Sequence, residues 1–252
     1  MEVKKQLTKF AVKYAKSSAE IESALRLRFE VFNLELNEGL ESSYSIGLDR
    51  DQYDTYCDHL IITDTLNDAV IGTYRLLLGS RVENTIGYYA ENEFHMSLLK
   101  KVPGEKLELG RACIHRDYRG TAVLNSMWAG IAEYIIKHEV RYIFGCGSIH
   151  TVNPNIISTI YAYLKEKFLA DEKYRVFPIK IIPGFNPAAI PDKKVVSNYM
   201  PPLLSAYIRL GARIAGEPAF DEQFGVADLL IILENDKIVG RYIRHYFEKE
   251  NA

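Results

Sequence analysis

Residues 107–120 form the most informative stretch of the chain: Leu107-Glu108-Leu109-Gly110-Arg111-Ala112-Cys113-Ile114-His115-Arg116-Asp117-Tyr118-Arg119-Gly120. The apolar first part predicts a strand that carries a carboxylate and a guanidinium. The basic second part predicts a turn, and periodic apolar residues after it predict a helix. A helix that starts after such a turn presents unbonded main-chain N–H groups, which bind anions. This order suits a phosphopantetheine thioester held beside a general base, so it points to acyl transfer.

Composition is that of an ordinary globular protein. The 252 residues are 48% hydrophobic and 25% charged, and the net charge of −2 argues against a general nucleic-acid binder. The longest apolar run, 227–233, is interrupted by Asp228 and is too short to span a membrane. The start lacks the apolar segment of a signal peptide. We therefore expect a cytoplasmic protein, and a peripheral contact with the inner membrane stays open as an alternative.

The cysteines and histidines predict no metal site. Cys57, Cys113 and Cys146 lie far apart without metal-ligand spacing, and the six histidines are scattered. Three such cysteines are typical of reduced thiols in a cytosolic protein. We expect neither a metal nor a tightly bound cofactor.

Hydrophobic periodicity divides the chain into alternating helices and strands. The expected strands are 8–14, 58–63, 69–78, 107–115, 142–149, 176–182 and 227–233. The expected helices are 18–36, 90–100, 121–138, 153–169 and 202–214, with loops at 37–56 and 186–200 and a last segment at 237–247. No repeat or linker is present, so we expect one domain over 1–252. Its core would cover 8–170, and 171–252 would be an extension packed on that core.

Buried arginines and a run of acids predict an ion-pair network. Four aspartates, at positions 49, 51, 54 and 58, fall in or beside the expected loop, as either a solvated acidic loop or a site for an amine or metal. Calcium is disfavoured because the spacing is not that of an EF-hand. Arginines on apolar faces are costly unless paired. We expect one partly buried network, with a purely structural role as the alternative, made by Arg28, Arg75, Arg111, Asp51, Asp54 and Glu108.

Glu108 is the candidate general base, because a protonated amine must lose a proton before it attacks a thioester. Main-chain N–H groups at 111–113 are candidates for stabilising the developing oxyanion. Cys113 is a candidate nucleophile, but a buried structural thiol is favoured because no histidine is suitably spaced. The turn 116–120 is a candidate phosphate loop, with a plain strand-to-helix turn as the alternative.

The order of elements resembles the GNAT N-acyltransferase fold, an α/β (α+β) fold with a central mixed twisted sheet flanked by helices, here with a C-terminal extension. Four motifs are similar to those of acyl-homoserine-lactone synthases: Arg28-x-x-Val31-Phe32, Asp51-x-Tyr53-Asp54, Gly72-x-x-Arg75-Leu76-Leu77 and Glu108-x-x-Arg111. In that family the arginines and acids organise the N-terminal helix and loop, and the glutamate lies near the amine.

A closer resemblance, over about 20–235, is to the ornithine-lipid N-acyltransferases (L-ornithine Nα-acyltransferases), a group also labelled hemolysins. It includes Val31-Phe32-Asn33-Leu34-Glu35-Leu36-Asn37-Glu38-Gly39, Cys57-Asp58-His59-Leu60 and Pro201-Pro202-Leu203-Leu204. The resemblance implies transfer of a long, often 3-hydroxylated acyl group from acyl carrier protein to the α-amine of an amino acid. With ornithine the product would be a lyso-ornithine lipid; more generally it is an N-acyl amino acid.

The residue chemistry described above and this resemblance together give the expected roles of the site residues. Glu108 and Arg111 would be catalytic. The amino-acid substrate would be bound by Arg28, Phe32, Asp51, Asp54 and Arg75. The phosphopantetheine of the donor would be bound by Cys113, Arg116, Arg119, Gly120 and Thr121.

The turn 116–121 departs from the Gln/Arg-x-x-Gly-x-Gly/Ala loop of acetyl-CoA enzymes, since Gly120 is its one glycine. This favours a carrier-protein donor over acyl-CoA. Because a carrier protein is acidic, we expect it to be steered by a basic patch built from Lys100, Lys101, Lys106, Arg116 and Arg119. The extension from Val176 onward is expected to help wall an acyl tunnel.

Three other functions are alternatives to this one. An acyl-homoserine-lactone-type synthase that uses S-adenosylmethionine is less favoured, because the long C-terminal half fits the lipid enzymes better. A non-catalytic acyl-carrier or lipid-binding module would keep the fold without the chemistry. A membrane-lytic protein lacks a supporting amphipathic or spanning segment.

Overall fold

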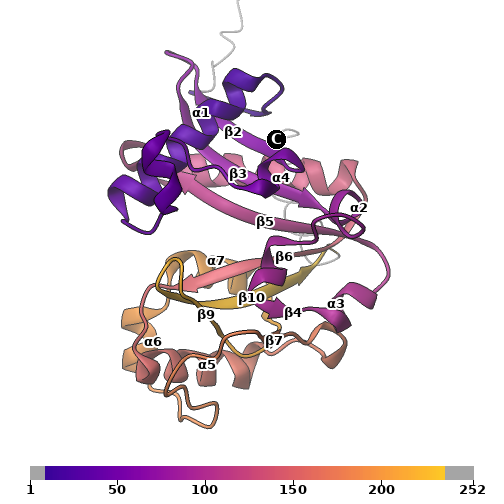
Figure 1. The fold of residues 1–252 in the computed structure, drawn as a ribbon, viewed down its shortest axis with the longest axis vertical. Helices are drawn as coiled ribbons and strands as arrows, with labels where there is room; N and C mark the ends of the chain where they lie inside the picture. The colour runs from indigo at the N-terminus through magenta and orange to yellow at the C-terminus, as the bar shows by residue number, and fades with distance from the viewer. Residues whose placement is uncertain (1–8, 236–252) are drawn as a thin grey trace, which may run out of the picture. The chain divides into compact units, whose positions relative to one another are not determined.

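The computed structural model describes residues 9–235 (Figure 1). The chain divides into two compact units, one made of residues up to 76 with 110–134 and the other of 77–109 with the residues from 135 onward. The division falls inside two strands, between Leu76 and Leu77 and between Leu109 and Gly110, and inside one helix, between Tyr134 and Ile135. The expected boundary near residue 170 lies inside the second unit. The expected segment 237–247 lies outside the described residues.

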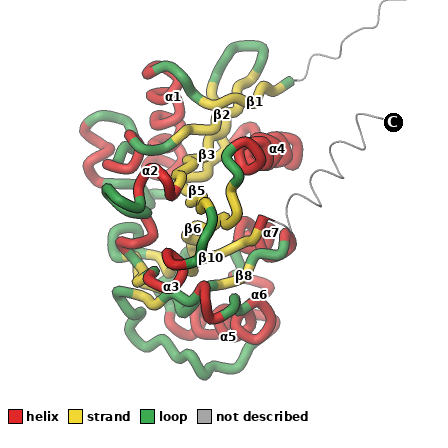
Figure 2. Tube along the Cα trace, turned by 90° about the vertical axis from the view of Figure 1, so that its right-hand side faces the viewer, coloured by secondary structure: helices red, strands yellow, loops and turns green. Residues whose placement is uncertain are grey.

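The first unit is built around antiparallel strands. β1 pairs with β2, β2 pairs with β3, and β3 is the neighbour of β5. In Figure 2, α4 lies to one side of β2 and β3 and α1 lies to the other. The elements are β1 (Phe10–Tyr14), α1 (Ser18–Arg28), η1 (Phe29–Glu35), η2 (Glu41–Ser45), η3 (Gln52–Thr55), β2 (Asp58–Asp64), most of β3 (Val70–Leu78), the end of β5 (Glu105–Ile114), η5 (Arg116–Tyr118) and most of α4 (Thr121–Lys137).

The first helix begins where the sequence predicts and ends differently. Ser17 caps it: its side chain accepts a hydrogen bond from the main-chain N–H of Glu20, whose carboxylate accepts from Ser17 in return. The expected helix 18–36 is α-helical to Arg28 and continues as a π-helix to Glu35. Such wide turns inside helices are frequent at functional sites.

The second unit contains the first half of β5, parallel to β6, and then β10 antiparallel to β6. β8 and β9 both pair with β10, and β4 pairs with β7 in a separate small sheet. Its other elements are α2 (Gly79–Val82), η4 (Tyr89–Asn92), β4 (Phe94–His95), α3 (Ser97–Lys101), β6 (Val140–Ile149), α5 (Pro154–Phe168), η6 (Glu172–Tyr174), β7 (Phe177–Pro178), α6 (Lys193–Tyr199), α7 (Pro202–Leu210), β8 (Arg213–Ile214), β9 (Ala219–Asp221) and β10 (Val226–Glu234).

The parallel pairing of β5 with β6 extends from Glu105 to Glu108. A glycine follows at the next position of β6, where a Cβ on Gly145 would lie 2.3 Å from the carbonyl oxygen of Leu109. A side chain there would push the strands apart, so the sequence requires glycine. Beyond it, Cys146 and Ser148 are half-buried although β6 is otherwise mostly buried.

The expected helix over 90–100 is wrong. The segment is broken into η4, the two-residue strand β4 and the short helix α3. Two tertiary contacts explain the break: Glu93 turns into the interior, and Phe94 pairs with Pro178 across the small sheet. Tertiary contacts of this kind override local helix propensity.

The C-terminal elements are shorter than expected. The strand predicted over 176–182 is reduced to β7, and the loop predicted over 186–200 contains α6. The helix predicted to reach 214 ends at Leu210, because Gly211 adopts the left-handed conformation (φ +101°) that terminates helices. The chain then forms β8, which pairs with β10.

Within residues 9–235 no helix is both long enough and apolar enough to cross a membrane.

Candidate functional site

Three arginines and three aspartates of the first unit form one buried network, here called the arginine–aspartate cluster: Arg28, Arg75, Arg111, Asp49, Asp51 and Asp54. Arg28 is fully buried, and its Nε donates to Asp49 Oδ2 at 2.8 Å while its Nη1 donates to Asp54 Oδ1 at 2.7 Å. Arg75 Nη1 donates to Asp51 Oδ2 at 2.6 Å and lies 3.3 Å from Asp54 Oδ1. The predicted pairing of Arg28 and Arg75 with acids of the loop is confirmed.

The structure adds Asp49 to the predicted network, and Asp58, the last aspartate of the acidic run, has a different partner. Arg111 lies 3.6 Å from Asp49 and 3.7 Å from Asp51. Asp58 instead accepts a hydrogen bond from the hydroxyl of Tyr134 at 2.6 Å. The alternative of a solvated acidic loop is wrong, since Asp49 and Asp54 are both buried.

The loop places its aspartates through a short helical turn. Asp51 caps η3, and Asp54 accepts from the main-chain N–H of Asp51 at 2.8 Å. Burial raises the pKa of Asp54, but the charges of Arg28 and Arg75 outweigh it and hold the pKa at about 2. Burial lowers the pKa of the neighbouring His59, and the charge of Arg28 lowers it further. The cluster therefore holds Asp54 ionised and favours a neutral His59.

Arg111 has a strained main chain. Its φ of +52° lies in the left-handed region, which is unusual for a residue with a side chain and interrupts the regular extension of β5. Its guanidinium carbon lies 5.9 Å from the centre of the Phe32 ring. The strain therefore coincides with a residue that the motif comparison singles out, beside a second such residue, Phe32.

Cys113 packs with Leu27 and Val31 in an apolar cluster, against which Phe32 also packs. Burial raises its pKa to about 12. A thiol in this state is protonated at neutral pH and is a poor nucleophile. The arrangement favours the structural thiol over the nucleophile.

Glu108 lies in the second unit, across the division of β5 from Arg111. Its side chain is buried, and its carboxylate accepts hydrogen bonds from the main-chain N–H groups of Tyr89 at 2.7 Å and Ala90 at 2.8 Å. These N–H groups open the short helix η4. The clamp fixes the orientation of the carboxylate, whose oxygens retain further lone pairs for a proton. Its role as a base stays a prediction.

The expected donor-binding turn is exposed. Arg116 and Gly120 lie on the surface, and α4 begins at Thr121. A Cβ added at Gly120 would meet no atom within 4 Å. Arg119 forms a two-pronged ion pair with Glu35 of the π-helix, at 2.6 and 2.7 Å. The glycine is thus not required by packing, and open space lies over the start of the helix.

The expected basic patch is only partly at the surface. Lys101 is exposed and Lys100 pairs with Glu91 at 2.7 Å. Lys106 is buried and lies 3.3 Å from Glu83, so it does not belong to an exposed patch. Lys106 lies in the part of β5 that is buried at four successive residues, 106–109, which its closeness in sequence to Lys100 and Lys101 does not reveal.

A second cluster of titratable groups lies in the second unit, and the sequence reasoning missed it. It consists of Glu93 and Asp228, here called the buried acid pair, and of Cys146. One carboxylate oxygen of each acid and the Sγ of Cys146 all lie within 4.8 Å of one another. Glu93 is 7% and Asp228 3% exposed. The thiol of Cys146 donates to Glu93 Oε1 at 3.7 Å. Asp228 was the available signal, because it is an acid inside an apolar strand.

Both acids of the buried acid pair have a raised pKa. Burial raises the pKa of Glu93, and the charge of Asp228 raises it further. Burial also raises the pKa of Asp228, although hydrogen bonds involving Ser148 and Glu93 oppose this. Two adjacent buried carboxyls without a cation between them do not readily ionise together, which agrees with the raised pKa of each.

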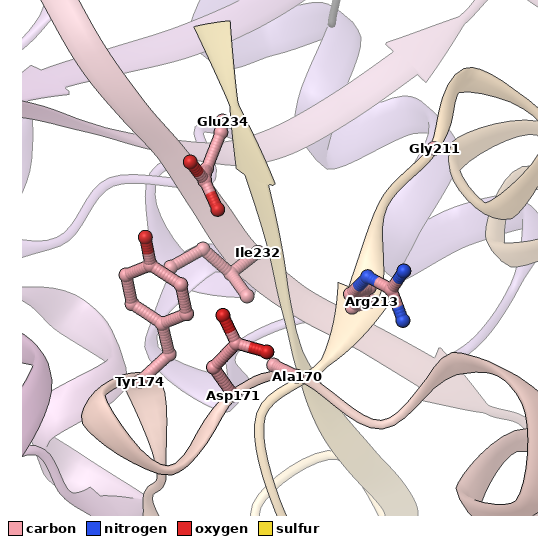
Figure 3. A pocket seen from close by; sticks show the side chains of 7 residues that line it. All are labelled: Ala170, Asp171, Tyr174, Gly211, Arg213, Ile232 and Glu234. Atoms are coloured by element: carbon pink, nitrogen blue, oxygen red, sulfur yellow. The ribbon is translucent and has the colours of Figure 1, made fainter.

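A small cavity of about 140 Å³ in the second unit is lined by Ala170, Asp171, Tyr174, Gly211, Arg213, Ile232 and Glu234 (Figure 3). Tyr174 points toward Glu234, and none of the predicted site residues lines the cavity. Acids, a phenol and an arginine make its wall too polar for an acyl chain. We do not assign this cavity to the predicted acyl tunnel.

Similarity to known proteins agrees with the fold. The family model for an acetyltransferase (GNAT) domain matches residues 27–129. The solved structure of a CoA-dependent acyl-homoserine lactone synthase, MesI, superposes with a TM-score of 0.55 at 10% identity, covering 94% of this chain and 95% of that one. This likeness shows the fold alone. The mixed sheet flanked by helices is therefore a GNAT fold, as predicted.

Two curated proteins are similar over nearly the whole length. The L-ornithine N(alpha)-acyltransferase of Brucella abortus (strain 2308) is 34% identical over 251 residues, which cover 95% of this chain and 89% of that protein. The L-ornithine N(alpha)-acyltransferase of Rhizobium meliloti (strain 1021) is 32% identical over 253 residues, covering 96% and 85%. The similarity includes both compact units.

Proposed function

This chain belongs to the L-ornithine N(alpha)-acyltransferase family and is an acyltransferase, and on that basis we propose that it transfers a long-chain acyl group to the α-amine of ornithine. The observation that carries the proposal is identity of 34% across 95% of the chain. The expected product is a lyso-ornithine lipid. The expected donor is acyl carrier protein with a 3-hydroxyacyl thioester, with acyl-CoA as the alternative donor.

Two features of the chain support an N-acyltransfer mechanism. Glu108 is held by the amides that open η4, in an orientation suited to a proton acceptor. The exposed glycine at the start of α4 leaves room for the phosphate of a pantetheine arm at the helix N-terminus. In the proposed reaction the amine nitrogen attacks the thioester carbon, the C–S bond breaks, and the amine proton passes to Glu108 directly or through water.

The test is transfer from defined donors. The protein is incubated with 3-hydroxyacyl carrier protein or with the matching acyl-CoA, and with ornithine, other amino acids or S-adenosylmethionine, and products are identified by mass. We expect acyl-ornithine, formed faster from the carrier protein. Transfer to S-adenosylmethionine in place of ornithine, or no transfer to any amine, would contradict the proposal.

A pair of variants on one strand tests the base. Glu108→Gln should slow transfer by roughly 10²- to 10⁴-fold, because the amine then lacks its proton acceptor. Glu105→Gln is the matched control, since Glu105 lies on the same strand and is half-buried. Unchanged turnover of a folded Glu108→Gln enzyme would remove the role of base.

A further inference from the structure

The buried acid pair differs from the acids of the arginine–aspartate cluster in lacking an arginine beside it; the charge that acts on Asp228 is that of His150, which lowers its pKa. Among residues 9–235, no lysine or arginine forms an ion pair with Glu93 or Asp228. Glu93 Oε2 and Asp228 Oδ1 are buried without a hydrogen-bond partner in the described chain. Buried polar atoms in folded proteins are nearly always satisfied, so two such oxygens on adjacent acids need an explanation.

The two oxygens and their neighbours match the needs of an ammonium group. An ammonium has three N–H donors and no acceptor, whereas the two unpartnered oxygens are acceptors. A cation at this place also removes the electrostatic obstacle to ionising both carboxyls. Cys146, which is half-buried on β6, lies beside the two buried acids.

We propose that Glu93 and Asp228 bind the side-chain ammonium of the acceptor amino acid and so select a diamino acid over its neutral analogue. The proposal rests on the proposed function, because that function supplies an acceptor with a cationic end. The binding groups are the carboxylates of Glu93 and Asp228. Cys146 and Ser148 of β6 lie beside them.

The short helix η4 relates this site to Glu108. Its first N–H groups hold the Glu108 carboxylate, and its last residue is followed directly by Glu93. The two ends of one four-residue turn thus fix the carboxylate assigned to the α-amine and a carboxylate assigned to the side-chain amine. An acceptor with an amine at each end of a flexible methylene chain has the matching chemistry.

A divalent metal fits the same residues less well. Metal binding to cysteine requires the thiolate, and burial together with the charge of Glu93 raises the pKa of Cys146 well above its ordinary value. The remaining donors are then two carboxylates, fewer than the three or four protein ligands of typical zinc sites. A metal bound at these residues would contradict the proposal.

The first experiment compares acceptors. Ornithine, lysine and norvaline, which has the ornithine skeleton without the terminal amine, are used with the wild type, Glu93→Gln and Asp228→Asn. The wild type should prefer ornithine to norvaline strongly. Each variant should raise KM for ornithine by about 30-fold or more, with kcat for bound ornithine nearly unchanged, and should lose the preference over norvaline.

Asp221→Asn is the matched control. Asp221 is a buried acid near the pair, but its Oδ1 accepts from the main-chain N–H groups of Gln223 and Phe224, and asparagine keeps that acceptor. The control should change KM by no more than about threefold. An unchanged ornithine-to-norvaline ratio in folded Glu93→Gln and Asp228→Asn proteins overturns the proposal.

A binding measurement separates this proposal from the proposed function. Ornithine, and not norvaline, should raise the Tm of the wild type, and this shift should vanish in both variants. A shift that persists in the variants overturns the site even if ornithine is acylated. A wild type that acylates no ornithine contradicts the proposed function, yet a variant-sensitive shift still supports the ammonium site. A stoichiometric metal in the purified protein, lost in both variants, also overturns the proposal.

Discussion

Arg28 Nη1 lies 2.7 Å from Asp54 Oδ1, and the Arg28 side chain is wholly inaccessible to solvent. A helix residue and a loop residue, twenty-six positions apart in the chain, therefore share one desolvated ion pair. Removal of one partner from such a pair leaves the other charge buried without compensation. The helix α1 and the loop after it depend on each other through this contact.

Arg28→Met should lower the free energy of unfolding by roughly 3–5 kcal/mol, because Asp49 and Asp54 would lose their buried counter-charge. The matched control is Arg26→Met on the same helix, where Arg26 pairs with Glu22 at the surface. That change should stay within about 0.5 kcal/mol. Urea unfolding measures both, and equal effects of the two substitutions would contradict a buried network.

Asp54 should contribute to stability only while it is ionised. Its folded pKa of about 2 lies below its ordinary value of 3.8, so the contribution is complete above pH 4 and is lost as the pH falls toward 2. The shift corresponds to about 2 kcal/mol. The destabilisation caused by Asp54→Asn should therefore be full at pH 6 and shrink by about that amount at pH 2. A penalty that does not change with pH would show that the charge of Asp54 is irrelevant.

Glu93→Gln should stabilise the protein at pH 8. The pKa of Glu93 is raised in the fold, so its burial costs stability at every pH above its ordinary value of 4.5 and the cost grows as the pH rises. An amide removes this cost, with an expected gain of about 1–3 kcal/mol at pH 8 and almost none at pH 4.5. Thermal unfolding at both pH values measures it. Glu22→Gln, an exposed control, should show no such pH dependence.

Gly120→Ala separates structure from donor binding. A Cβ there meets no atom within 4 Å, so the free energy of unfolding should change by less than about 0.5 kcal/mol. If the phosphate of the donor passes over the start of α4, the methyl group should raise KM for the donor and leave KM for ornithine unchanged. A donor KM equal to that of the wild type would place the phosphate elsewhere.

The arginine–aspartate cluster was predictable because each arginine could be recognised from its own segment as one that needs an acidic partner. An arginine on an apolar helix stripe or inside a strand must find an acid, and the loop between them supplied aspartates. Which aspartates take part was not predictable, since Asp49 and Asp58 differ through the course of the loop. The start of the first helix was predictable in the same way, from its clear hydrophobic periodicity.

The acid pair could not be assembled from sequence. Glu93 lies in a stretch with helical periodicity, and its burial depends on the pairing of β4 with β7, which are each two residues long. Asp228 could be recognised as an acid in an apolar strand, but no feature of the sequence around it indicates that Glu93 lies beside it. The clamp on Glu108 was equally hidden, because its partners are main-chain amides whose side chains carry no signal.

The turn Tyr89–Asn92 connects the positions of Glu108 and Glu93. It is anchored at one end by an acid on β5 and leads at the other into an acid that meets β10, so a displacement of this single coil would move both carboxyls in concert. In the proposed reaction, a change in the length of this turn would disturb binding of the side-chain ammonium and deprotonation of the α-amine together. In the proposed site, this one short helix would therefore set which distance between the two amines of an acceptor fits the enzyme.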